Sequence, residues 1–117
     1  MILAVVAAVG LYGQAKRTIV YRADVSVPNH EAVITHVEIG AGQSAGRHTH
    51  PGEEISYVLE GEADIIVDGV GTRHVKAGDG FVIPANTIHD AHATNGELKL
   101  VGVYYVEKGK PLATPAK

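Results

Sequence analysis

From Lys16 onward the chain consists of short runs of β-branched and aromatic residues that stop at glycine, proline or Asp-Gly turns. These runs recur roughly every 8 to 12 residues, which is the spacing of strands in sandwiches and barrels. No segment after Lys16 carries apolar residues at the three- and four-residue spacing of an amphipathic helix. The pattern therefore predicts an all-β domain whose sheet closes as a sandwich or barrel.

The turn residues divide this region into a series of expected strands and extended segments. Asp68-Gly69 predicts a tight hairpin, because this dipeptide suits the backbone angles of two-residue turns. Gly61 is expected to end one strand, and the next strand pairs back. The segment 108–117 has prolines and no apolar periodicity, so we expect a loose tail. The expected strands cover residues 18–21, 32–39, 47–50, 54–60, 63–67, 72–75, 81–83, 87–93 and 98–106.

Length and composition fit one domain. A chain of 117 residues is close to one ordinary domain, and 45% hydrophobic residues favour a packed core over disorder. We expect residues 16–108 to form the barrel, residues 109–117 the tail, and residues 1–15 a separate N-terminal segment. A formal net charge of −3 argues against a nucleic-acid partner. The absence of cysteine excludes disulfides, zinc–thiolate sites and thiol nucleophiles.

The N-terminal segment supports two interpretations. Ile2 to Leu11 is an apolar run as long as a signal-peptide core, and Gly13-Gln14-Ala15 places small residues where a signal peptidase reads. This predicts a signal peptide over residues 1–15 and a periplasmic or secreted protein. No Lys or Arg precedes Lys16, so the alternative is a strand or helix packed on the barrel or a partner subunit of a cytoplasmic protein. Crossing a bilayer takes about 20 residues, so we expect no stable membrane span.

Four residues carry the chemistry of the sequence: His48, His50, Glu54 and His89. Side chains alternate along an extended segment, so His48 and His50 point the same way. The Pro51-Gly52 turn then brings Glu54, at the start of the next strand, close to both imidazoles. His89 belongs to a later strand and can join them only if the sheet closes on itself.

This donor set predicts one bound divalent transition metal. Imidazole nitrogens with one carboxylate oxygen suit borderline or hard divalent ions. We favour Mn or Fe, with Ni, Co, Zn or Cu as alternatives. Four protein ligands leave two positions of an octahedral ion open, which is typical of catalytic rather than structural sites.

Neighbouring polar residues have simpler interpretations. Glu53 adjoins Glu54 but is expected to be a solvated charge, and His92 should face away from a ligand at position 89. Ser56 shares the face of Glu54, so it either lines the cavity or fills the packed barrel. Phe81 and Ile83 either form an apolar wall near the metal or are plain core. The remaining histidines, His30, His36 and His74, are expected to be solvated or at the edge of the core.

The spacing around these ligands resembles the cupin superfamily. The pattern Gly42-(x5)-His48-x-His50-(x3)-Glu54-(x6)-Gly61 matches the first cupin motif at every position. The second motif is matched at its glycine, proline and histidine by Gly78, Pro84 and His89. It departs at Asn86, which replaces a glycine, and at Ala93, which replaces an asparagine. Neither departure affects a ligand, and Asn also tolerates left-handed backbone angles.

The resemblance covers residues 31–106 and is closest to the small single-domain cupins. It implies an all-β fold, the double-stranded β-helix or jelly-roll barrel with six to eight strands. It also implies a metal bound by His48, His50, Glu54 and His89, and frequently a homodimer.

A site of this kind supports several functions. We favour a dioxygenase-type oxidoreductase acting on a small organic molecule, because a redox metal with two open positions can bind substrate and dioxygen together. In that mechanism Glu54 could leave the metal and act as a catalytic base. The alternatives are a non-redox isomerase, decarboxylase or lyase, and a non-catalytic module that binds a metal and a small ligand.

Overall fold

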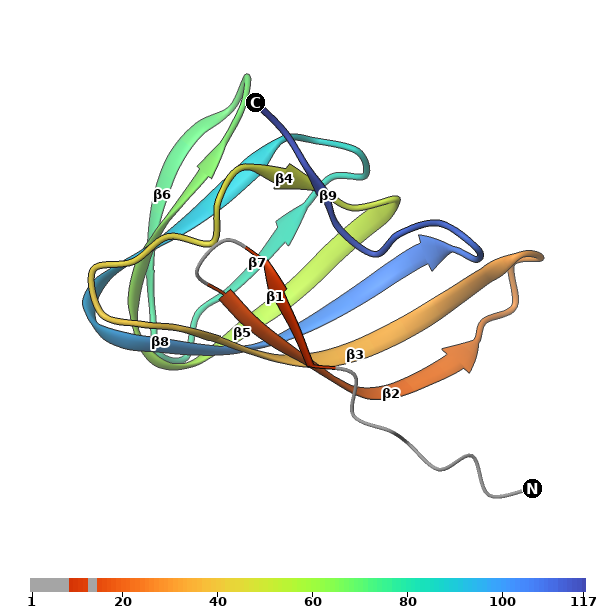
Figure 1. The fold of residues 1–117 in the computed structure, drawn as a ribbon, viewed down its shortest axis with the longest axis horizontal. Coiled ribbons are helices and arrows are strands. Elements are labelled where there is room, and N and C mark those ends of the chain that lie inside the picture. Colours follow the sequence, from red (N-terminus) through yellow and green to blue (C-terminus); the bar gives the residue numbers. More distant parts are fainter. Residues whose placement is uncertain (1–8, 13–14) are drawn as a thin grey trace.

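The computed structural model describes residues 9–12 and 15–117, and every regular element in this part is a β-strand (Figure 1). The all-β prediction is confirmed. Within the described residues, no helix has the length and apolar composition needed to cross a bilayer. The strands are β1 (Val9–Tyr12), β2 (Ala15–Asp24), β3 (His30–Ile39), β4 (His48–Thr49), β5 (Gly52–Val67), β6 (Gly71–Lys76), β7 (Gly80–Ile83), β8 (His89–Glu107) and β9 (Thr114–Pro115).

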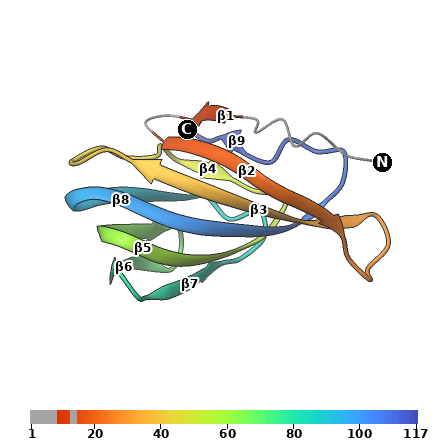
Figure 2. The same ribbon diagram turned by 90° about the horizontal axis from the view of Figure 1, so that it is seen from below.

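These strands form one antiparallel sheet that curls on itself (Figure 2). The order runs β1-β2-β3-β8-β4-β9, and β5 joins this path by pairing with β6, β7 and β8. The C-terminal half of β8 lies between β3 and the first half of β5. Its N-terminal end pairs with β4 and with the second half of β5. The two long strands thus bend the sheet into the half-barrel of a jelly roll.

Gly61 bends a strand that it was predicted to end. Residues 54–60 and 63–67 belong to the single strand β5, whose pairing with β8 shifts register between Glu60 and Ala63. Gly61 has φ of 83°, and a Cβ atom there would lie 2.3 Å from the carbonyl oxygen of Glu97. Only glycine fits this bulge, which turns the chain without interrupting the strand. The prediction that residues 63–67 pair back on the preceding run was therefore wrong.

Alternation along β5 decides which side chains reach the interior. Glu54, Ser56 and Val58 are buried, whereas Ile55 and Tyr57 between them are about half exposed, at 50% and 52%. The polar residues Glu54 and Ser56 therefore occupy inward positions of the strand. A carboxylate in such a place is costly unless it is paired, so its surroundings have to supply partners.

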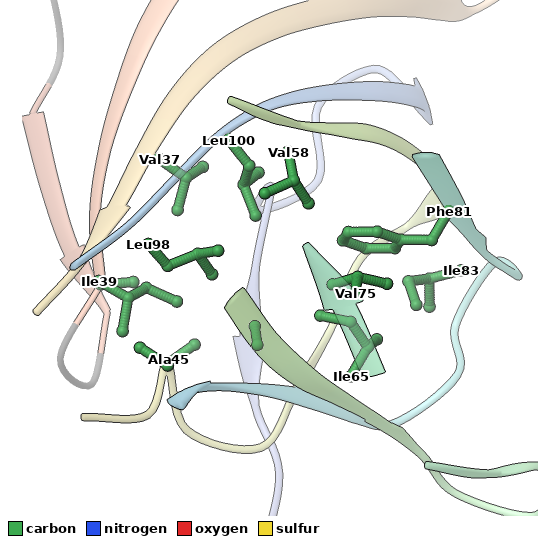
Figure 3. Close-up of a cluster of buried hydrophobic side chains, with 13 residues drawn as sticks. Val37, Ile39, Ala45, Val58, Ile65, Val75, Phe81, Ile83, Leu98 and Leu100 are labelled. Atoms are coloured by element: carbon green, nitrogen blue, oxygen red, sulfur yellow. The ribbon is translucent and has the colours of Figure 1, made fainter. Parts of the chain in front are cut away.

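Most of the interior is apolar. One buried cluster collects side chains from strands on both sides of the curl, with Phe81 at one end (Figure 3). A smaller cluster contains Val33, Tyr104 and Val106 on β3 and β8. The larger cluster consists of Ala15, Val37, Ile39, Ala45, Val58, Ala63, Ile65, Val75, Phe81, Ile83, Ala93, Leu98 and Leu100.

Both ends of the chain differ from a simple barrel with loose tails. In the C-terminal tail, strand β9 pairs with β4, at Thr114 opposite Thr49, so this part is held against the sheet rather than loose. At the other end, β1 pairs with β2 as an edge strand. The signal-peptide prediction for residues 1–15 falls largely on residues 1–8 and 13–14, which lie outside the described residues.

Candidate metal centre

The four predicted ligands meet at one point inside the curled sheet. One ligand atom from each of His48, His50, Glu54 and His89 lies within 4.8 Å of the others, and all four residues are buried. The strands account for this convergence. His48 on β4 is the direct cross-strand partner of His89 on β8, and Glu54 enters from β5. The pairing of β4 with β8 brings His48 and His89 together although they are far apart in the sequence.

Each imidazole is oriented by a backbone carbonyl. Nδ1 of His48 donates to the oxygen of Gly46 at 2.6 Å, and Nδ1 of His89 donates to the oxygen of Thr87 at 2.9 Å. Nδ1 of His50 donates to the oxygen of Leu112 at 2.7 Å. A carbonyl can only accept, so each ring carries a proton on Nδ1, and in its neutral form presents an Nε2 lone pair. This is the tautomer that a metal-binding imidazole needs.

Glu54 faces two of these rings. Its Oε1 lies 3.1 Å from Nε2 of His50 and 3.2 Å from Nε2 of His89. Its other oxygen, Oε2, accepts a hydrogen bond from the hydroxyl of Ser56 at 2.7 Å. Ser56 therefore fixes the rotation of the carboxylate and directs Oε1 toward the imidazoles.

The close approach of His50 to Glu54 is explained by a cation between them. Nε2 of His50 is enclosed and has no hydrogen-bond partner among the described residues, despite the nearby carboxylate oxygen. With its proton on Nδ1, the neutral ring points a lone pair at that oxygen. Two lone pairs at such a separation repel each other unless a proton or a metal ion lies between them.

The electrostatics of the site favour the metal-binding forms of its ligands. Burial alone would raise the pKa of Glu54, but the adjacent rings of His50 and His89 favour the ionised carboxylate, outweigh burial and hold this pKa below its ordinary range. Burial is the main cause that lowers the pKa of His48 to about 3, and the neighbouring His89 adds to it. An ionised carboxylate and a neutral imidazole are the states that bind a metal.

The residues present thus fit a divalent metal ion. Three Nε2 lone pairs and one carboxylate oxygen point at a common centre, and their backbone and side-chain partners hold them there. Neutral nitrogen donors with a single hard oxygen suit a divalent transition ion.

A small cavity adjoins the ligands, and we call it the site cavity. Its volume is about 20 Å³, where roughly 10–15 Å³ by this measure holds one water molecule. Outside the ligand set, its polar lining residues are Arg17, Asp90 and Tyr104. The lining residues are Ala15, Arg17, Val37, Ile39, Ala45, His48, Glu54, Ile65, Phe81, His89, Asp90, Ala91, Leu100 and Tyr104.

Arg17 and Tyr104 form a buried pair that the sequence analysis missed. Nε of Arg17 donates to the hydroxyl of Tyr104 at 3.1 Å, and both side chains are buried. Burial, with the charge of Glu54, raises the pKa of Tyr104 to about 12, so the phenol stays protonated. Alternation could have found both residues: Ala15 and Arg17 share the inward face of β2, and Tyr104 follows Leu98 and Leu100 on the inward face of β8.

The other residues weighed from the sequence lie outside the ligand cluster. Glu53 is exposed, as expected. His92 is bound through Nδ1 to the hydroxyl of Ser44 at 2.7 Å, away from the cluster. His74 is exposed but not isolated, because it pairs with Glu62 and Asp64 on the outer surface. Phe81 lines the site cavity, so the apolar-wall interpretation holds for that residue.

Comparison with known proteins agrees with the motifs. Residues 35–106, more than half of the chain, match the cupin domain family. The chain therefore belongs to the cupin family, and the resemblance drawn from the sequence is confirmed. No match was found among the curated proteins.

Solved structures share the fold over most of the chain. An uncharacterized conserved protein with a double-stranded β-helix domain from Klebsiella pneumoniae is 22% identical, with a TM-score of 0.73 over 99% of this chain and 96% of that chain. The polyketide cyclase RemF from Streptomyces resistomycificus is 18% identical, with a TM-score of 0.69 over 100% and 84% of the two chains. The DMSP lyase DddQ from Ruegeria pomeroyi is 24% identical, with a TM-score of 0.64, and the match covers 73% of this chain but 43% of that chain. These likenesses establish the double-stranded β-helix fold.

Proposed function

We propose that this protein is a divalent-metal-dependent enzyme that acts on a small organic molecule by non-redox chemistry of the lyase or isomerase kind. One observation carries the metal dependence. The three Nδ1 atoms of His48, His50 and His89 all donate to backbone carbonyls, which directs three Nε2 lone pairs and Glu54 Oε1 to one point. A packed core gains nothing from four converging acceptors, so the arrangement is best explained by a bound cation.

The size of the site cavity favours one small substrate. A volume of about 20 Å³ beside the ligands is little more than one water molecule needs, so the cavity admits the reacting end of one small substrate. A dioxygenase has to accommodate dioxygen together with the reacting part of its substrate. A non-redox reaction needs only the substrate oxygen at the metal, and the structural neighbours include a lyase and a cyclase.

A bound divalent ion would supply Lewis-acid polarisation of a substrate oxygen. The chain's own residues hold the ion and shield the reacting group from water. His48, His50 and His89 hold the ion as neutral donors. Glu54 is fastened by Ser56, and its lowered pKa makes it a weak proton acceptor, so we assign it to the ligand set rather than to base catalysis. The apolar wall around Phe81 excludes water from the reacting group.

A dioxygenase is the second candidate, and the ligand count supports it. Four protein donors occupy four positions of an octahedral ion and leave two for substrate and dioxygen. The two candidates differ in their need for oxygen. The protein is loaded with Mn, Fe, Co, Ni or Zn in turn, and substrate loss from a metabolite mixture is followed by NMR with and without air.

Turnover in the absence of oxygen supports the non-redox enzyme, and turnover that consumes oxygen supports the dioxygenase. Metal content below about a tenth of an equivalent after reloading would exclude both, since a site with these donors should retain a divalent ion. The homodimer and the periplasmic or secreted location stay predictions. Sedimentation velocity and N-terminal sequencing of the protein from its native cell test them.

A further inference from the structure

Arg17 is a buried cation that forms no ion pair with a carboxylate of the described residues. The residue is 8% exposed and lines the site cavity together with His48, Glu54 and His89. Among the described residues the guanidinium has one hydrogen-bond acceptor, the hydroxyl of Tyr104, and it forms no ion pair with a carboxylate. The chain carries no Asp or Glu before Asp24, so residues 1–14 hold no carboxylate that could neutralise it.

Such a charge is expensive to bury. An arginine is permanently charged in proteins, and an unpaired buried charge destabilises a fold strongly. A methionine would fill the same space with a smaller loss of folding stability. The burial of Arg17 is therefore best explained by an anionic partner that binds from solvent. In the site cavity such a partner can reach the guanidinium and the ligand cluster at once.

The shape of the guanidinium indicates which chemical group of the partner it binds. Tyr104 takes Nε, and its ring also lies under the guanidinium, whose Cζ is 5.4 Å from the ring centroid. The Nη1 and Nη2 nitrogens remain as a planar fork, which matches the two oxygens of a carboxylate.

The charge of the loaded cavity agrees with an anionic ligand. A divalent ion and Arg17 contribute positive charge, whereas Glu54 and Asp90 each contribute one negative charge. The carboxylate of Asp90 is already engaged, because its Oδ1 accepts from the backbone nitrogens of Gly46 and Ala91. With a divalent ion bound, the cavity lining therefore has a net charge of one positive unit. The other lining residues are mostly apolar.

We propose that Arg17 binds the carboxylate of the substrate, and that the substrate is a small carboxylic acid whose neighbouring oxygen faces the histidine–glutamate cluster. This inference rests on the proposed function, since it deepens the same site. Tyr104 is the positioning residue that holds the guanidinium in its cavity-facing rotamer. Acids with a 2-oxo, 2-hydroxy or second carboxylate group have the required pair of oxygen functions a few bonds apart.

The test measures binding to zinc-loaded protein by isothermal titration calorimetry. The probes are pyruvate, glycolate and malonate, each compared with its uncharged amide. Arg17→Met removes the charge and keeps the bulk, Arg17→Lys keeps the charge and loses the fork, and Arg22→Met is the control. Arg22 lies on the same strand but is exposed and paired with Glu31.

We expect at least one acid to bind the wild-type protein, and to bind the Arg17→Met protein at least about tenfold more weakly. Binding of the amides and of zinc should stay within a factor of about three, and the Arg22→Met protein should behave as wild type. We also expect Arg17→Met to melt at the same temperature as wild type or higher, because it removes an unpaired buried charge.

Two results would overturn the inference while leaving the metal site intact: no saturable binding of any acid to zinc-loaded wild-type protein, or equal acid affinity in wild type and Arg17→Met. If Arg17→Met does not fold, Arg17→Lys decides, since a lost fork should weaken acid binding more than amide binding. Failure to bind zinc at all is a different outcome, because it refutes the proposed function itself.

Discussion

The carbonyl oxygen of Leu112 accepts a hydrogen bond of 2.7 Å from Nδ1 of His50, so the C-terminal tail orients a metal ligand 62 residues earlier in the chain. The same tail pairs β9 with β4, the strand that carries His48. Acceptors of this kind set the tautomer and direction of a ligating imidazole. The tail is therefore part of the site, although none of its side chains belongs to the ligand cluster.

Removal of residues 111–117 should lower metal affinity by about 10- to 100-fold, because this is the usual effect of losing the hydrogen-bond acceptor that orients a ligating imidazole. Leu112→Ala is the matched control, because it keeps the carbonyl and removes only a side chain packed near Tyr104. Affinity is measured by competition with a chromogenic chelator. Equal losses in the truncated and Leu112→Ala proteins would mean that packing, and not the hydrogen bond, matters here.

The ligand set itself predicts a sharp contrast between neighbouring acids. Glu54→Gln and His89→Ala should each weaken metal binding by at least about 100-fold, since a direct ligand matters more than its supporting partner. Glu53→Gln should leave binding unchanged, because Glu53 is exposed on the opposite face of β5. Thermal melting gives a second readout: metal at 100 times Kd should stabilise the wild-type protein by about 2.7 kcal/mol. Unchanged affinity in both ligand variants would show that the wrong residues were chosen.

Three of the four ligands could be predicted from sequence because their geometry is local. The alternation of His48 and His50 and the turn before Glu54 place three donors together without any knowledge of the rest of the chain. His89 needed the second cupin motif as well. What spacing could not predict is the shell behind the ligands, since the carbonyls of Gly46, Thr87 and Leu112 are backbone atoms that every residue possesses.

Two errors in the expected strand boundaries share one physical cause. Gly61 was taken as the end of a strand, and Asn95-Gly96 separates two expected strands, yet β5 and β8 continue through both positions. A glycine with positive φ is needed equally for a hairpin turn and for a bulge inside a long bent strand. Only the pairing of distant strands decides between them. Arg17 was missed because its strand was expected to begin at residue 18.

Ser56→Ala tests whether the hydroxyl positions Glu54. The loss of its 2.7 Å hydrogen bond leaves one oxygen of a buried carboxylate without a donor, which should cost about 1–3 kcal/mol of stability and reduce metal affinity. Ser44→Ala is the control, because that hydroxyl is bound to His92 outside the ligand cluster. Chemical denaturation and chelator competition measure the two effects. A Ser56→Ala protein with wild-type values of both would show that Ser56 is only a filler of the packed barrel.

The buried His48 predicts how the metal-free protein responds to acid. Burial lowers its pKa from 6.5 to about 3, so between these values the unfolded chain binds a proton that the folded chain does not. The free energy of unfolding should therefore fall as pH drops from about 6.5 toward 3, by up to about 1.4 kcal/mol per pH unit from this residue.

Glu54 adds to this loss only at lower pH, because a carboxyl with a lowered pKa contributes stability above its unfolded pKa that disappears as pH falls through the folded value. Urea titrations of the metal-free protein between pH 7 and 4 measure the slope. His48→Asn should flatten it, whereas His36→Asn, a partly exposed histidine on β3, should leave it unchanged. A wild-type slope that His48→Asn does not reduce would mean that this imidazole takes up its proton in the folded protein as readily as in the unfolded chain, and that the folded site does not favour its metal-binding form.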